Sequence, residues 1–227
     1  METSITRKRL SYPRKVGNLF QLSFGEELAN AISHGIPALI LLCTLPVVAI
    51  YGYNKDGTIL ATGYSIFFIC LFLMFLASTL YHAMDFNSKH KSVFRIIDHI
   101  MIYFAIAGTF TPICLSVIEG TLGLIVLILQ WLMVLIGILY KSISKVKLPK
   151  ASVIMYLIMG WSGILLIPSL IGSGNWGLIF FIALGGILYS IGVYFYSQKS
   201  KPYYHFIWHL FILLASISHV VAIIVYI

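Results

Sequence analysis

Two histidines stand four residues apart in a stretch that is otherwise bulky and apolar. The stretch reads YYHFIWHLFILL, and its histidines are His205 and His209. On a helix this spacing puts both imidazoles on one face, where they can bind a single metal ion. An ionisable group within an apolar helix is costly unless it faces a partner or a cavity, so we favour a metal site. The alternative is a pair of interfacial histidines in an aromatic belt with Tyr203, Tyr204 and Trp208.

Polar residues at the ends of two other apolar runs supply the remaining groups of such a site. STLYHA contains Ser78 and His82, and FRIIDHIMIY contains Asp98. A third imidazole from a facing helix completes a site of three protein ligands, in which zinc keeps its fourth position for water. Asp98 fits a carboxylate that faces this water or serves as a fourth ligand, and Ser78 fits a donor to an oxyanion. The predicted zinc ligands are therefore His82, His205 and His209.

Four more polar residues are expected around these ligands. EELANAISHG places Glu27, Asn30 and His34 on one helical stripe, and His99 follows Asp98 directly. His219 lies about 15 Å of helix beyond His209, too far for the same ion. We therefore expect His219 to be a core histidine whose ring nitrogens are satisfied.

The composition indicates where these residues must lie. The chain has 227 residues, of which 60% are hydrophobic and 10% are charged, whereas a soluble domain is about half apolar and about a quarter charged. The class is therefore a polytopic protein of the cell membrane. The net charge of +8 does not indicate nucleic acid, because the basic residues lie in loops at the membrane edges. The three cysteines lie in apolar stretches and predict no disulfide framework.

Apolar runs of about 20 residues predict an all-α bundle of seven transmembrane helices. They cover residues 33–53, 59–82, 97–118, 122–140, 152–170, 176–197 and 204–227. All but one of the 15 basic residues, Lys55, fall in the N-terminal segment or in alternate connections. The positive-inside rule then places the N-terminus in the cytoplasm and the C-terminus outside. We expect a basic cytoplasmic segment at 1–25 and the transmembrane domain at 26–227.

The motifs EELANAISHG, STLYHA, IDHIMIYFAIAGTFTP and HFIWHLFILLASISH, in this order, resemble those of the haemolysin III family. That family belongs with the progestin and adipoQ receptors and the alkaline ceramidases in a superfamily of membrane hydrolases. The resemblance implies a seven-helix bundle with zinc near its cytoplasmic end. It assigns the ligands to His82, His205 and His209, and places Asp98 and Ser78 near the metal-bound water.

Three functions agree with these residues. The first is zinc-dependent hydrolysis of an amide or ester bond in a membrane lipid, with Asp98 and Ser78 as catalytic residues. The second is the cytolytic, pore-forming activity that the family name implies, although spans four to six offer almost no polar lining. The third is a receptor-like regulator of membrane lipid state. The sequence leaves open whether the chain forms a homo-oligomer.

Overall fold

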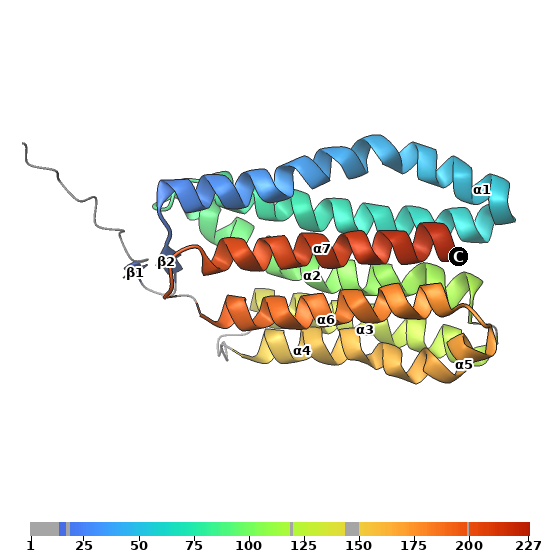
Figure 1. Ribbon diagram of the computed structural model, residues 1–227. Helices are drawn as coiled ribbons and strands as arrows, with labels where there is room; N and C mark the ends of the chain where they lie inside the picture. The colour runs from blue at the N-terminus through green and yellow to red at the C-terminus, as the bar shows by residue number, and fades with distance from the viewer. Residues whose placement is uncertain (1–13, 17–18, 119, 144–149, 199) are drawn as a thin grey trace, which may run out of the picture.

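Long helices make up most of the computed structural model, which describes residues 14–16, 19–118, 120–143, 150–198 and 200–227 (Figure 1). A short antiparallel hairpin precedes them, formed by β1 (Arg14–Val16) and β2 (Leu19–Gln21). The helices are α1 (Phe24–Ala83), α2 (Lys89–Ser116), α3 (Thr121–Ile143), α4 (Ala151–Trp161), η1 (Ser162–Leu166), α5 (Ile167–Gly172), α6 (Trp176–Ser197) and α7 (Tyr204–Tyr226). Residues 1–13, 144–149 and Lys199 carry part of the basic charge behind the orientation prediction and lie outside the described residues.

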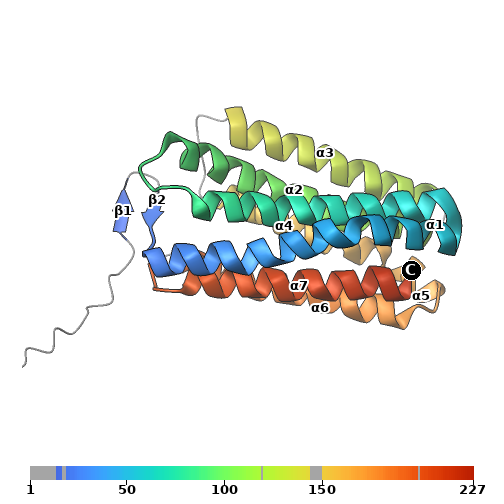
Figure 2. The ribbon, with the colours of Figure 1, turned by 90° about the horizontal axis from the view of Figure 1, so that it is seen from above.

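Helix α1 is folded back on itself. Its 60 residues would extend for about 90 Å as a straight helix, about three times the thickness of the hydrocarbon core. Asp56 and Gly57 have non-helical backbone angles, and Gly57 has a φ of 69°, which glycine adopts without steric cost. Two antiparallel limbs meet at this break (Figure 2). Their contact is close, because a Cβ on Gly35 would lie 3.3 Å from Thr79.

Among the described residues, six helical elements are long and apolar enough to cross a membrane, where the sequence predicted seven separate helices. The difference arises because the predicted spans 33–53 and 59–82 are the two limbs of α1, with the turn at Asp56 and Gly57 inside one continuous element. The predicted span 152–170 is also less regular than expected, since α4, η1 and α5 follow one another over Ala151–Gly172. These lengths and compositions are those of a multi-pass membrane protein.

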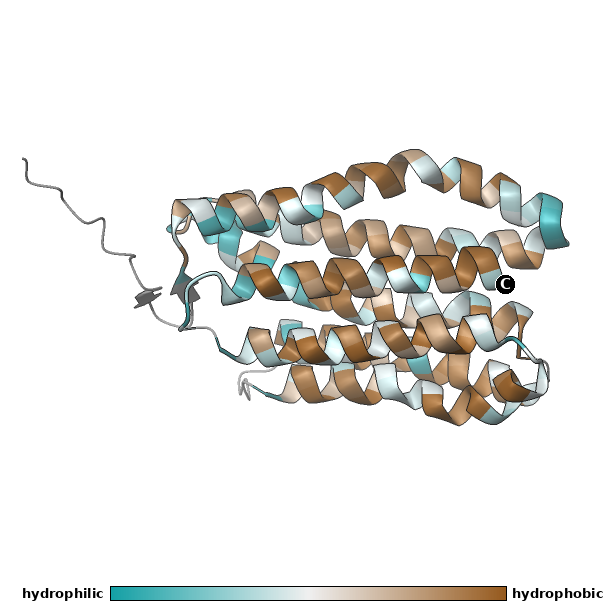
Figure 3. Ribbon diagram, viewed as in Figure 1, coloured by the Kyte–Doolittle hydropathy of each residue, from teal (hydrophilic) through white to brown (hydrophobic). Residues whose placement is uncertain are grey.

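The outer face of the bundle is apolar, and small residues hold its helices together. Figure 3 shows hydrophobic residues along the helices and hydrophilic ones concentrated toward their ends. A Cβ on Gly108 of α2 would lie 2.7 Å from the Cβ of Cys70, and one on Gly137 of α3 would lie 2.5 Å from the ring of Tyr103. Glycines at these contacts let α2 approach α1 and α3 closely, as is common between membrane helices.

A carboxylate ties the start of α1 to the start of α7. Ser23 and Glu26 form a capping box, in which the Ser23 Oγ accepts from the Glu26 N–H and the Glu26 carboxylate accepts from the Ser23 N–H. The Glu26 Oε1 also accepts from the backbone N–H of Tyr203 at 2.5 Å. Tyr203 has a φ of 60° and directly precedes α7. The first turn of α7, which carries His205, is therefore held against the first turn of α1.

Candidate metal centre

Three histidines from two helices converge at the end of the bundle where α1 and α7 begin. His82 comes from the last turn of α1, and His205 and His209 come from the first two turns of α7. One ring nitrogen from each lies within 4.8 Å of the other two. The His205 Nε2 is 3.3 Å from the His82 Nε2 and 3.3 Å from the His209 Nε2. The structure thus brings together the three residues that the sequence predicted as ligands.

Protons alone cannot satisfy these three nitrogens. A neutral imidazole has one donor nitrogen and one acceptor nitrogen. The His82 Nδ1 lies 2.6 Å from the carboxylate of Glu27, which can only accept, so its Nε2 presents a lone pair to the cluster. The Ser33 hydroxyl donates to the Asn30 carbonyl, so its oxygen accepts from the His209 Nδ1 at 3.5 Å and the His209 Nε2 also presents a lone pair. His205 lies between these two lone pairs and has one proton at most.

A cation of the size of zinc fits the spacing. Zinc binds imidazole nitrogen at about 2.0–2.1 Å with tetrahedral geometry, which places two such nitrogens about 3.3–3.4 Å apart. The two Nε2 separations at His205 are 3.3 Å. Facing lone pairs at this distance are what a bound divalent cation requires, so the three imidazoles could hold one.

Glu27 orients His82 and is itself held by a buried lysine. One carboxylate oxygen contacts the His82 Nδ1, and the other lies 2.7 Å from the Lys91 Nζ. Lys91 is 1% exposed, and its Nζ also donates to the carbonyl of Met84 at 3.1 Å. A carboxylate behind a ligating imidazole fixes the ring and its tautomer. Glu27 therefore lies beside His82. Lys91 was not among the predicted residues, because it looks like an ordinary basic loop residue.

Asp98 and Ser78 lie on the wall of a cavity that begins beside the cluster. Both side chains line this cavity, and they are 5% and 2% exposed. The Ser78 Oγ has no hydrogen-bond partner among the described residues. The ligand atoms that lie within 4.8 Å of one another come from the three histidines and do not include Asp98. The structure therefore gives no support to Asp98 as a fourth ligand. Its carboxylate is 3.3 Å from the His99 Nδ1.

The other residues expected around the ligands have different surroundings. His34 stacks on His209 with ring centroids 3.9 Å apart. Asn30 is fully buried, and its side-chain amide has no partner among the described residues. His99 donates from Nδ1 to the Arg95 carbonyl at 2.7 Å, and its Nε2 accepts from the Tyr196 hydroxyl at 3.2 Å. No sequence pattern indicated that Tyr196 contacts His99, because Tyr196 lies in the apolar helix α6, 97 residues further along the chain.

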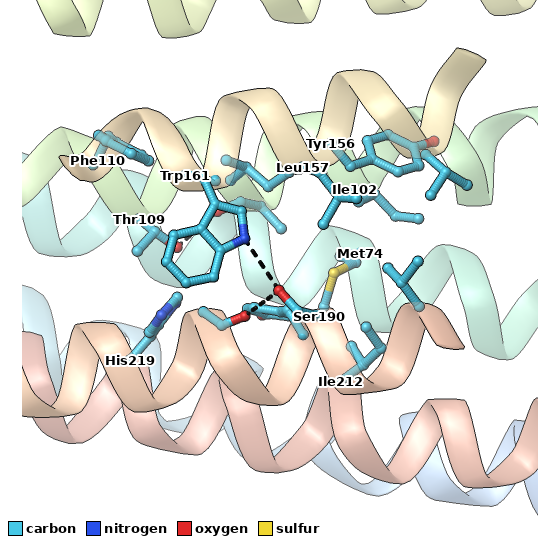
Figure 4. A pocket seen from close by; sticks show the side chains of 18 of the residues that line it. Met74, Ile102, Thr109, Phe110, Tyr156, Leu157, Trp161, Ser190, Ile212 and His219 are labelled. Atoms are coloured by element: carbon cyan, nitrogen blue, oxygen red, sulfur yellow. Dashed lines mark hydrogen bonds between the residues drawn. The ribbon is translucent and has the colours of Figure 1, made fainter. Parts of the chain in front are cut away.

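The cavity is apolar between its two ends (Figure 4). Side chains of α1, α2, α4, η1, α5, α6 and α7 line it, and its volume is about 150 Å³. Trp161 donates to the Ser190 Oγ at 3.1 Å, which joins α4 to α6 along the wall. His219 lies at the other end and is 8% exposed. The prediction of a fully satisfied histidine is wrong, because the His219 Nδ1 has no partner among the described residues.

Comparison with known proteins identifies the family of this chain. Residues 22–220 match the profile of the family described as Haemolysin-III related. The chain is 39% identical to the "Hemolysin-3 homolog" of Bacillus subtilis (strain 168) over 83% of its length and 88% of the relative's. It is 38% identical to "Hemolysin-3" of Bacillus cereus over 83% and 85% of the two chains. It is 29% identical to the human "Monocyte to macrophage differentiation factor" over 87% and 83%. The chain belongs to the haemolysin III-related family of multi-pass membrane proteins.

Proposed function

We propose that the protein is a zinc-dependent hydrolase of an amide or ester bond in a membrane lipid. The observation that carries the proposal is the facing of three imidazole Nε2 atoms beside an apolar cavity. His34, which stacks on His209, lies on the wall of this cavity together with Asp98 and Ser78. The imidazoles supply a metal site, and the cavity supplies a wall against which an acyl chain can pack. A scaffold that only bound a structural ion would not need a cavity beside it, whereas a lipid hydrolase needs both.

The proposed chemistry assigns one role to each polar group beside the cluster. Zinc held by His82, His205 and His209 would supply a Lewis acid that polarises a carbonyl and makes water easier to ionise. The Asp98 carboxylate takes a proton from the attacking water and returns it to the leaving amine or alcohol. The Ser78 hydroxyl, which has no partner in the described structure, donates to the oxygen on which charge develops. The water oxygen first forms the new C–O bond, and the scissile C–N or C–O bond then breaks as the charge leaves the carbonyl oxygen and the leaving group takes the proton from Asp98.

We also propose that both limbs of α1 cross the membrane, so that the chain spans it seven times with the N-terminus in the cytoplasm and the C-terminus outside. Figure 1 supports this, because the hairpin before α1 and the C-terminus lie at opposite ends of the bundle. Lys55 lies just before the break in α1, away from the other described basic residues. The metal cluster would then lie near the cytoplasmic face.

The cytolytic function that the relatives' names carry receives no support from the cavity. A pore needs a polar lining through the whole bilayer, and this cavity is apolar between its ends. Six residues show this along its length: Met74, Ile102, Ile106, Val153, Leu157 and Ile212. We therefore propose hydrolysis in preference to pore formation.

The purified protein should contain about one zinc ion per chain, and replacing a ligand should remove it. We expect His205→Ala and His209→Ala to lose the metal, as measured by inductively coupled plasma mass spectrometry. His90→Ala is the matched control, because His90 is exposed at the start of α2. Full zinc content in both ligand variants would contradict the assignment.

Replacing Glu27 should weaken the metal site without abolishing it. Glu27→Gln leaves an oxygen for the His82 Nδ1 but removes the charge that pairs with Lys91. Loss of such a carboxylate typically costs about 10–100-fold in metal affinity, which competition with a zinc chelator can measure. The control is Asp85→Asn, an exposed carboxylate between α1 and α2. An unchanged affinity in Glu27→Gln would show that the carboxylate does not support the ligand.

Asp98 and Ser78 variants should keep the metal and lose turnover. We expect Asp98→Asn to lower the rate of fatty-acid release from acyl amides about 10²–10⁴-fold, and Ser78→Ala to lower it about 10²–10³-fold. Thr79→Ala is the control, because Thr79 is the next residue but its hydroxyl donates to the Phe75 carbonyl. Normal turnover in Asp98→Asn would refute the role of its carboxylate.

The proposed topology predicts the outcome of reporter fusions. Alkaline phosphatase fused after Ile227 should be active, because it is folded outside the cytoplasm, and the same enzyme fused after Ser197 should be inactive. The second fusion, at the end of α6, serves as the internal control. Activity in the reverse pattern would place both the C-terminus and the metal cluster on the opposite sides of the membrane from those proposed.

A further inference from the structure

The end of the cavity far from the metal cluster contains a second polar group that the proposed hydrolysis does not use. We propose that this end, around His219, binds a hydrogen-bond donor carried part-way along the acyl chain of the lipid, such as a chain hydroxyl. The proposal rests on the proposed function in one respect, since it names the class of acyl chain that the same cavity accepts.

The fold makes room for the His219 ring at this position. His219 projects from α7 and lines the cavity, while it remains only 8% exposed (Figure 4). A Cβ on Gly185 of α6 would lie 2.2 Å from the His219 Nε2, so a side chain at position 185 would displace the imidazole. Gly185 thus leaves space for a polar ring at position 219. If this contact served only to pack the core, an apolar side chain at position 219 would fill the space better.

The hydrogen bonding of His219 determines what the cavity can bind. Its Nε2 lies 3.4 Å from the carbonyl oxygen of Ile182, which can only accept, so Nε2 carries the ring proton. Its Nδ1 then presents a lone pair, and this atom is buried and unpartnered in the described structure. Leaving such an acceptor unpaired against a methylene chain costs free energy. The complementary ligand group is a donor, a hydroxyl or an amide N–H, and a carboxylate or ester carbonyl does not fit.

The neighbouring polar groups offer acceptors as well. Thr109 and His219 lie toward the same end of the pocket in Figure 4, with the indole of Trp161 between them in this view. The Thr109 hydroxyl donates to the Ala105 carbonyl at 2.9 Å, so its free lone pairs can only accept. The Trp161 indole donor is used by Ser190. This end of the cavity therefore presents acceptors and no free donor from these groups.

The position of His219 along α7 fixes where the donor must lie on the ligand. Ten residues separate His209 from His219, which corresponds to about 15 Å of helix. The intervening wall is apolar, with Ile212, Met74 and Ile102 among its residues. A lipid whose scissile carbonyl lies at the metal cluster would thus reach His219 through a run of methylenes. The donor is expected beyond the middle of a long acyl chain.

Competitive binding of two fatty acids tests the proposal. The probes are ricinoleic acid, which has a hydroxyl about two-thirds of the way along its chain, and oleic acid, which lacks it; each displaces a fluorescent fatty acid from the metal-loaded, detergent-solubilised protein. One added hydrogen bond to a buried acceptor predicts about tenfold tighter binding of ricinoleic acid. His219→Leu should abolish this preference, and His219→Asn, which keeps an acceptor near the position of Nδ1, should retain it.

Three further samples make the result decisive. Gly185→Ala should also lose the preference, because it displaces the ring without removing it, and it replaces His219→Leu if that variant fails to fold. Ser218→Ala should keep the preference, since the Ser218 hydroxyl donates to the Phe181 carbonyl outside the cavity wall. The third sample is the unaltered protein tested for turnover of acyl amides, which does not enter a ratio of two affinities. Failure of the hydrolase proposal would thus appear as absent turnover with the preference intact.

Two results would overturn the proposal. Equal affinities for the two acids in the unaltered protein would mean that water alone pairs with the His219 Nδ1. A full tenfold preference in His219→Leu, or in Gly185→Ala if the leucine variant does not fold, would place the hydroxyl elsewhere in the cavity.

Discussion

The rest of this structure depends on three imidazole nitrogens that face one another. They carry too few protons for every lone pair among them to be hydrogen-bonded. Glu27 fixes a proton on the far side of His82, and Ser33 does the same for His209, so both rings direct a lone pair toward His205. One proton on the His205 Nε2 can pair with only one of these lone pairs at 3.3 Å, whereas a cation between the three nitrogens pairs with all of them.

Two adjacent glutamates, on the first turn of α1, hold this arrangement. Glu26 caps its own helix and binds the backbone at the start of α7, which sets the position of His205. Glu27 bridges His82, at the far end of the same folded-back helix, and Lys91, in the first turn of α2. Three helices are therefore joined through two carboxylates, and the half-buried charge of Glu27 is balanced by the buried Lys91. An apolar cavity begins beside this polar end of the bundle and extends to His219. It therefore has polar groups at both ends and an apolar wall between them, as a lipid-binding site requires.

Sequence patterns could predict most of this arrangement, and the reasons for the failures are physical. Two features were predictable because they depend only on residues close together in the sequence. They are the apolar runs of membrane-spanning length and the four-residue spacing of His205 and His209. The fusion of two predicted spans into α1 was not predictable, because only two residues, Asp56 and Gly57, have non-helical backbone angles between its two limbs. The burial of Lys91 was missed because it depends on a partner 64 residues away. The position of the His219 ring depends on the space left by Gly185, which no pattern along α7 reveals.

X-ray absorption spectroscopy at the zinc edge, on the purified protein, tests the central claim most directly. We expect three imidazole nitrogens at about 2.0–2.1 Å with one further light atom. The same measurement on His205→Ala should show the loss of imidazole scattering or of the metal itself. A sulfur ligand, a shell of oxygen atoms without imidazole, or protein without zinc would contradict it.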